Sequence, residues 1–377
     1  MPGTTAWIDL AKLRANIARV RERLPGGIKV LFVVKSDAYG HGIVPAARAG
    51  IQAGVEQLGV VTVGEGEELR TAGIDVPILL LGPILPEEIP RAIELGLAIQ
   101  VSDQRFAVRL AQAAERLHAR PSVHVKVDTG MGRFGVSTGD AVELVETLSR
   151  ISALRVEGIY THLSSADSVD PDARAYTLRQ IEVFVSLLRA LERRSLLPRL
   201  RHIANSAGFI QYENEVTAPP FTMVRIGTLF YGYPEVDAPW VAEIEPVARL
   251  TAPVVALRTV REGEFVGYAR SYRASTPRRV AVITAGYGTG LPPGLADRGY
   301  VWVRGKLAPV VGRIYLDHAV IDVTEVDGVT IGDEVEIIGP HIPADRLAAE
   351  IGLEVCELLV PALSGAERRV YDDQHGE

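Results

Sequence analysis

Eight apolar runs of strand length, alternating with stretches of helical periodicity, constrain the fold of this chain more than any other feature. The runs are 28–34, 58–63, 76–81, 97–101, 123–127, 154–160, 201–204 and 222–226. Apolar residues at helical spacing fill most of the intervals, as in 141–148 and 172–197. An alternation of buried strands and helices predicts a parallel sheet covered by helices. Eight such units within about 230 residues favour a closed (β/α)8 barrel over an open sheet.

The pattern changes after Pro239, where short strand-like runs are separated by glycine-containing turn signals. These runs are 254–260, 279–284, 301–303, 308–311, 319–323 and 334–338. One helix, at 343–351, is expected near the end. We therefore predict an α/β chain with an N-terminal (β/α)8 barrel over 9–238 and a C-terminal all-β domain over 239–377. An N-terminal strand within 1–8 is expected to join the second domain.

Composition narrows the function classes. The formal net charge of -7 argues against nucleic acid or an anionic membrane as a main partner. No stretch approaches the roughly 20 apolar residues of a membrane helix, and the N-terminus lacks the pattern of a signal peptide. The single cysteine excludes an internal disulfide, and the scattered histidines give no reason to expect a metal site. A cytoplasmic protein is expected.

Lys35 stands at the end of the first barrel run, where barrels of this kind place their chemistry. Burial at a strand end disfavours an ammonium and leaves an amine that can attack a carbonyl. On this evidence alone, a paired structural charge is the alternative interpretation. The residue is therefore a candidate for covalent catalysis.

Polar residues also follow four later barrel runs. They are Lys126 to Arg133, Thr161-His162, Asn205-Ser206 and Arg225 to Thr228. Each could be an ordinary loop cap, but the shared position at the strand ends predicts a common site. The segments 205–208 and 227–228 suit a phosphate group, because they offer hydroxyls and backbone N–H groups where helices begin.

The ten residues Val33-Val34-Lys35-Ser36-Asp37-Ala38-Tyr39-Gly40-His41-Gly42 resemble, almost residue for residue, the cofactor attachment motif of the alanine racemase family. Further matching segments occur in the family's order, at 126–136, 161–162, 202–207, 224–232, 266–268, 286–287 and 311–313. The resemblance covers essentially the whole chain. It implies the cofactor pyridoxal 5'-phosphate (PLP) and a homodimer whose active site is shared between subunits.

The resemblance implies a role for each matching residue. Lys35 would carry PLP and act as one of two bases, and Tyr268 from the partner subunit would be the other. Arg225 would face the pyridine nitrogen and, with His162, form a relay to Tyr268. The remaining cofactor contacts would come from Tyr39, His162, Asn205, Ser206, Gly227 and Thr228.

Substrate contacts are implied in the same way. Arg133 would approach the substrate carboxylate, and the backbone of Leu316 and the side chain of Tyr287 would line the pocket. Lys126 matches a lysine that some members carbamylate. Two departures from the family pattern stand out: Tyr315 replaces a cysteine, and Leu353 stands where the family has a tyrosine on the phosphate.

The sequence therefore predicts a PLP-dependent alanine racemase, an isomerase that supplies D-alanine for cell-wall peptidoglycan. Because the pocket entrance is altered, a serine or broad-specificity amino acid racemase is the nearest alternative. A non-catalytic PLP carrier is a second alternative, although a carrier has no need of the domain that bears Tyr268. A PLP-dependent aldolase or decarboxylase of related fold is a third.

Overall fold

The computed structural model describes residues 3–372, which form two compact units. One unit comprises residues 14–38 and 43–244, and the other comprises 3–13, 39–42 and 245–372. The predicted bounds of 9–238 and 239–377, with a strand in 1–8, stay a prediction. Their ends at residues 1–2 and 373–377 lie outside the described residues.

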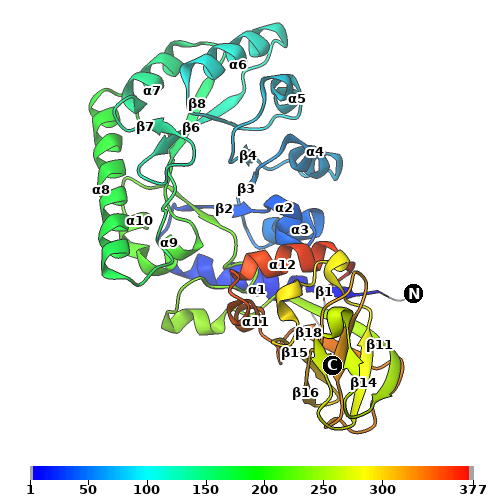
Figure 1. Ribbon diagram of the computed structural model, residues 1–377. Helices are drawn as coiled ribbons and strands as arrows, with labels where there is room; N and C mark the ends of the chain where they lie inside the picture. The colour runs from blue at the N-terminus through cyan, green and yellow to red at the C-terminus, as the bar shows by residue number, and fades with distance from the viewer. Residues whose placement is uncertain (1–2, 373–377) are drawn as a thin grey trace. The chain divides into compact units, whose positions relative to one another are not determined.

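The first unit contains the predicted barrel (Figure 1). Within the described chain its eight strands are β2 (Lys29–Val33), β3 (Gln57–Val60), β4 (Ile78–Leu80), β5 (Ile99–Val101), β6 (Ser122–Asp128), β8 (Arg155–Tyr160), β9 (Leu200–His202) and β10 (Met223–Ile226). Each pairs in parallel with its neighbour, and β10 pairs with β2. A parallel bridge between Leu79 and Ala98 links β4 to β5 and completes the ring. The (β/α)8 prediction is confirmed.

Helices lie around these strands (Figure 1). They are α1 (Leu10–Arg23), α3 (Ile43–Gln52), α4 (Val63–Thr71), α5 (Ile89–Glu94), α6 (Gln104–Arg116), α7 (Ala141–Arg150), α8 (Pro171–Arg193), α9 (Ser206–Gln211) and α10 (Glu213–Thr217). Helix α1 leads from β1 (Thr5–Asp9) of the second unit into β2, and the others connect successive barrel strands. Capping residues fix several starts. Asp103 accepts a hydrogen bond from the backbone of Phe106, and Asp170 caps α8 ahead of Pro171.

The strand predicted at 58–63 is shorter than expected. β3 ends at Val60, because Thr62 caps the next helix and Val63 is its first residue. The side chain of Glu65 accepts a hydrogen bond from the Thr62 backbone, which completes a capping box. The apolar Val63 is therefore a buried residue of helix α4 and does not extend the strand.

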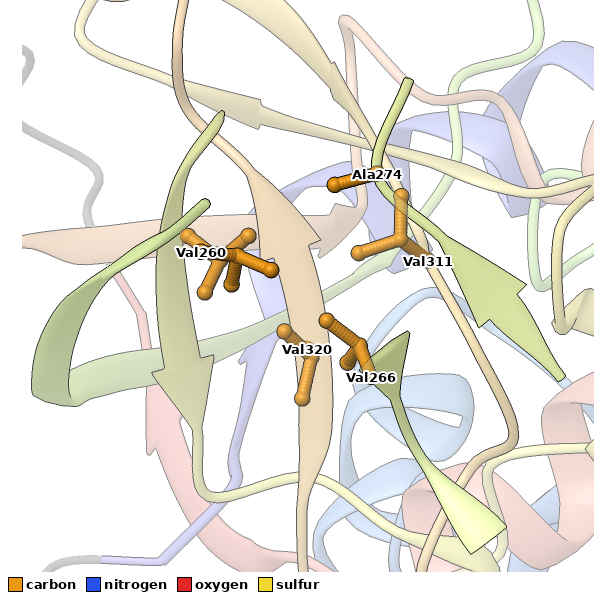
Figure 2. Packing of buried hydrophobic residues seen from close by; sticks show 6 residues of the cluster. Val260, Val266, Ala274, Val311 and Val320 are labelled. Carbon is orange, nitrogen blue, oxygen red and sulfur yellow. The ribbon is translucent and has the colours of Figure 1, made fainter. Parts of the chain in front are cut away.

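The second unit is built on β-sheet, as predicted. Its strands are β1 (Thr5–Asp9), β11 (Ala248–Val260), β12 (Phe265–Val266), β13 (Tyr272–Arg273), β14 (Arg278–Ile283), β15 (Tyr300–Val303), β16 (Lys306–Pro309), β17 (Ala319–Asp322), β18 (Glu334–Ile338) and β19 (Glu367–Tyr371). The N-terminal strand β1 lies between β11 and β19 in the sheet. Figure 2 shows part of the core, where the side chains of Val260, Val266, Ala274, Val311 and Val320 meet.

The expectation of a single closing helix is wrong. Helix α11 (Ala344–Glu350) matches it, but a second helix, α12 (Val355–Ser364), follows. Pro361 lies inside α12, and because a proline ordinarily ends or bends a helix, the sequence pattern does not predict a helix here. Among the helices of residues 3–372, none is long and apolar enough to cross a membrane.

Candidate active site

Buried polar side chains form a layer inside the barrel. Lys126 and His124 come from β6, Tyr160 from β8, His202 from β9 and Arg225 from β10. These four strands are consecutive neighbours in the sheet. Barrel interiors are usually filled by branched apolar residues, so a layer of this kind requires a compensating set of hydrogen bonds.

Arg225 is the centre of that layer and is only 3% exposed. Its Nη2 donates to the carbonyls of Thr161 (2.9 Å) and Ile203 (3.1 Å) and lies 3.1 Å from His162 Nδ1. Its Nη1 lies 3.1 Å from His202 Nδ1. A guanidinium only donates, so both imidazoles accept at Nδ1 and carry their proton on Nε2. Burial lowers the pKa of Arg225 to about 10, which leaves it protonated at neutral pH.

A second histidine extends this chain of contacts. His202 Nε2 lies 3.1 Å from His124 Nδ1, so the proton on His202 is donated to His124. Burial lowers the pKa of His124 to about 4, and burial followed by the charge of Arg225 holds the pKa of His202 well below its usual value. Both rings are therefore neutral. The ring of Tyr160 stacks on His202 with centroids 4.9 Å apart.

Lys126 is buried in the same interior and is only 3% exposed. Its Nζ lies 4.9 Å from the ring centroid of Tyr160 and 5.9 Å from that of Phe134. Burial, and after it the positive charges of Arg225 and Arg133, lower the pKa of Lys126 to about 6. At neutral pH the side chain is therefore mostly an uncharged amine.

The loop after β6 brings Arg133 toward the same rim. The carboxylate of Asp128 accepts hydrogen bonds from the backbone N–H groups of Gly130 (2.9 Å) and Met131 (2.9 Å), which turns the chain back on itself. The hydroxyl of Tyr176 on α8 donates to the Gly130 carbonyl at 2.7 Å. Arg133 itself is exposed and stacks 4.9 Å from the ring of Phe134.

Lys35 follows β2 and begins a turn, residues 35–39, that we call the Lys35 turn. Its backbone is left-handed at Ser36, Asp37, Ala38 and Tyr39, with φ of 53°, 53°, 54° and 53°. Residues other than glycine adopt this conformation at a cost on the order of 1–2 kcal/mol each. The turn is therefore strained and must be held by contacts around it.

The pKa of His162 is affected by the charge of Lys35. Burial comes first among the causes that hold the pKa of His162 well below its usual value, followed by the charges of Arg225, Lys126, Arg133 and Lys35. The lysine therefore lies close enough to the polar layer for its charge to act there. The imidazole of His162 is neutral, and the positive charge of the predicted relay resides on Arg225.

A hydrogen bond also connects the loops that follow β9 and β10. The side chain of Asn205 caps α9 by accepting from the Gly208 N–H at 2.9 Å. The hydroxyl of Ser206 accepts from the Gly227 N–H at 3.1 Å. Ser206, Gly227 and Thr228 are buried. Hydroxyl and amide groups from the two loops predicted to hold phosphate thus converge.

The other predicted residues, Tyr39, Tyr268, Tyr287 and Leu316, belong to the second unit. Tyr287, Tyr268 and Leu316 are 51%, 68% and 53% exposed. Backbone hydrogen bonds tie two of their loops together, from Tyr287 N–H to the Tyr315 carbonyl (2.9 Å) and from Gly288 N–H to the Leu316 carbonyl (2.7 Å).

Tyr315 lies beside Tyr268. The two ring centroids are 5.3 Å apart at an interplanar angle of 54°, and both residues line a cavity of about 560 Å³. The ring of Tyr315 packs on the valine-rich core of Figure 2. Leu353, the second departure from the family pattern, is half-buried just after α11.

Three members of the buried layer were not among the predicted site residues: His124, Tyr160 and His202. A usable signal was present in the sequence. His124 and Lys126 are two residues apart in an otherwise apolar run, and alternate residues of a strand point to the same face. Tyr160 likewise ends the apolar run 154–160, and His202 lies within the run 201–204.

Comparison with known proteins gives one answer for both parts of the chain. The model of the alanine racemase N-terminal domain matches residues 8–235, and that of the C-terminal domain matches 247–371. Alanine racemase of Geobacter sulfurreducens is 39% identical over 348 residues, covering 92% of this chain and 90% of the relative.

Solved structures agree. The alanine racemase of Clostridium difficile has a TM-score of 0.92 and 28% identity, covering 99% of this chain and 97% of that one. The alanine racemase of Bacillus anthracis with bound L-Ala-P has a TM-score of 0.89 and 29% identity, covering 100% and 96%.

A barrel with a lysine at a strand end and a buried arginine at its centre, followed by a β domain, defines a two-domain PLP-dependent enzyme. More narrowly, the chain belongs to the alanine racemase family.

Gly158 gives a stability test of the buried layer. A Cβ at this position would lie 2.2 Å from His124 Nδ1, so Gly158→Ala must displace the histidine chain. We expect a loss of about 1–3 kcal/mol in the free energy of unfolding, measured by urea denaturation. Gly64→Ala is the control, because its Cβ would meet no atom closer than 3.9 Å. Equal stability of the two variants would contradict the packing described.

Proposed function

We propose that this protein interconverts L- and D-alanine with PLP attached to Lys35, and that it supplies D-alanine for peptidoglycan in the cytoplasm. The observation that carries the proposal is the buried Arg225 network beside a strand-end lysine, in a chain that matches the alanine racemase family across both domains. The Bacillus anthracis relative is titled as an alanine racemase with bound L-Ala-P, which supports alanine as the substrate.

The side chains present fit PLP. Lys35 supplies an amine for attachment, Arg225 a donor for the ring nitrogen, and His162 a neighbouring polar group, and Tyr39 at the end of the Lys35 turn is proposed as a further cofactor contact. The converging loops of Asn205, Ser206, Gly227 and Thr228 would bind the phosphate. When bound, PLP withdraws electrons from the substrate Cα and so makes its proton removable.

Arg225 would donate a hydrogen bond to the ring nitrogen. Its pKa of about 10 keeps it protonated, so it gives up no proton at neutral pH. Its other N–H groups are held by carbonyls and by neutral imidazoles, which fixes the guanidinium in one orientation. The protein thus presents a fixed donor at this position and no acid.

Racemisation requires a base on each face of Cα. Lys35 Nζ would move the proton on one face, and Tyr268 Oη would move it on the other. Tyr268 is 68% exposed, as expected for a side chain that completes the site of a second subunit. We therefore infer a homodimer with shared sites. Arg133, the backbone of Leu316 and Tyr287 would bind and orient the substrate.

Lys126 is proposed to carry a carbamate. An uncharged amine can attack carbon dioxide, releasing one proton and forming an anion on Nζ. The flanking charges of Arg225 and Arg133, which lower the pKa of Lys126, would stabilise that anion. The modification would replace a buried neutral amine with an anion paired to the two guanidinium groups and hold Arg133 in place.

The activity itself can be tested directly. We expect the purified protein to interconvert L- and D-alanine, followed by circular dichroism, and Lys35→Ala to abolish the reaction. Borohydride reduction should leave a cofactor adduct on Lys35 in mass mapping. Faster turnover of serine would reassign the substrate, and an adduct without α-proton exchange in heavy water would indicate a PLP carrier.

Shared sites can be tested by mixing inactive subunits. Tyr268→Phe removes one base and Lys35→Ala removes the other, but a heterodimer of the two variants retains one intact site. Random mixing after subunit exchange should restore about a quarter of the wild-type rate. No recovery, with heterodimers demonstrated by native mass spectrometry, would place both bases on one chain.

Carbamylation of Lys126 should depend on pH. The folded-state pKa of about 6 lies below the usual 10.5, so the amine becomes available as pH rises through about 6. With ¹³C-bicarbonate, we expect a carbamate signal at about pH 8 that is lost at about pH 5, and absent in Lys126→Gln.

The unmodified protein provides the complementary measurement. Below pH 10.5, the usual pKa of lysine, Lys126 is protonated in the unfolded chain. In the folded protein the same amine stays unprotonated until the pH falls to about 6. This group therefore lowers stability progressively as pH falls from 10.5 to about 6, and fully below that. In carbon dioxide-free buffer, Lys126→Gln should remove that part of the pH dependence, and an unchanged profile would contradict a buried neutral amine.

A further inference from the structure

The Lys35 turn depends on contacts that hold its left-handed backbone. Four consecutive residues without the freedom of glycine adopt positive φ, so other conformations of the turn compete with it. A contact made only in the left-handed form shifts that balance toward it. Lys35 is the first residue of the turn, so a contact that holds the turn also fixes the position from which the Lys35 side chain extends.

One contact that reaches the turn from a different βα unit comes from Glu65. Its Oε1 accepts a hydrogen bond from the backbone N–H of Ser36, the residue after Lys35, at 2.5 Å. Other contacts are local to the turn. The Ala38 N–H donates to the Val34 carbonyl at 2.9 Å, and the Asp37 carboxylate accepts from the Ile43 N–H at 2.7 Å.

Glu65 is itself held firmly. Its second oxygen, Oε2, accepts from the backbone N–H groups of Val61 (2.9 Å) and Thr62 (3.1 Å). Its own N–H donates to Thr62 Oγ1 at 3.1 Å, which completes the capping box of α4. One carboxylate therefore spans two loops at the strand ends of β2 and β3, which are neighbours in the sheet. Charge-assisted hydrogen bonds of this kind are stronger than neutral ones.

We propose that Glu65 is a positioning residue for Lys35, acting through the amide of Ser36. The proposal rests on the proposed function for what Lys35 does, but the structural link between Glu65 and the turn is independent of it. A capping box normally serves only its own helix. Here one oxygen of the box is committed to the turn that carries the catalytic amine.

Two substitutions of Glu65 separate the roles of its oxygens. Glu65→Ala removes both, whereas Glu65→Gln keeps one acceptor oxygen and serves as the conservative variant. Thr62→Ala is the matched control, because it weakens the same capping box and leaves the Glu65 carboxylate intact. All three are measured as holoenzyme, by amide hydrogen exchange of residues 36–38 and by steady-state kinetics with alanine.

We expect faster exchange at 36–38 in Glu65→Ala and less so in Glu65→Gln, with no change in Thr62→Ala. The kcat of Glu65→Ala should fall about 100-fold with little change in KM, since a small displacement of a reacting group has an effect of that size. Thr62→Ala should stay within about twofold of wild type in kcat, because it does not touch the Ser36 contact.

Unchanged exchange at 36–38 in both Glu65 variants would overturn the proposal, as would equal losses of kcat in Glu65→Ala and Thr62→Ala. If Glu65→Ala does not fold, Glu65→Gln decides the question by the same exchange measurement. A wild-type protein without racemase activity would instead contradict the proposed function, and the exchange result would still stand for the turn.

Discussion

A guanidinium buried inside the barrel is the constraint on which the rest of the site depends. An unpaired charge at this depth would cost several kcal/mol, so the guanidinium of Arg225 must be surrounded by hydrogen-bond acceptors. Two are backbone carbonyls and two are imidazole nitrogens. The histidines are therefore required to be neutral and to accept at Nδ1. Burial and the arginine charge lower their pKa values in the same direction.

The same charge determines the state of Lys126. The charges of Arg225 and Arg133 repel an ammonium group on Lys126. Burial and this repulsion lower the pKa of Lys126 to about 6. The aromatic faces of Tyr160 and Phe134 accommodate the side chain and provide no counterion. The barrel interior therefore has an excess of positive charge, which favours an anion at Lys126 and the anionic groups of cofactor and substrate.

Much of this arrangement could be predicted from sequence, because barrel topology follows from local patterns. Apolar runs located the strands, and strand ends located Lys35, His162 and Arg225. In the structure, Arg225 Nη2 lies 3.1 Å from His162 Nδ1. The catalytic and binding roles of these residues stay predictions.

Other features depend on tertiary contacts that no local pattern encodes. The histidine chain arises only when β6, β8, β9 and β10 assemble in that order in the sheet, and Gly158 on β8 leaves the space that His124 occupies. The left-handed conformation of 36–39 is equally non-local. Nothing in Ser-Asp-Ala-Tyr requires positive φ, and a contact from α4 is part of what holds it. Likewise, α12 continues through Pro361 against the usual preference of that residue.

Departures from a family pattern are best judged by what supports them locally. Tyr315 is far larger than the cysteine of the family pattern, yet its ring packs on an existing valine core on one side and against Tyr268 on the other. The backbone that carries it is fixed by hydrogen bonds to Tyr287 and His318. A substitution supported in this way fills space beside the proposed base without disturbing the loop. The proposed second base, Tyr268, therefore has an aromatic neighbour in Tyr315, while the proposed first base, Lys35, lies at the start of a left-handed backbone turn.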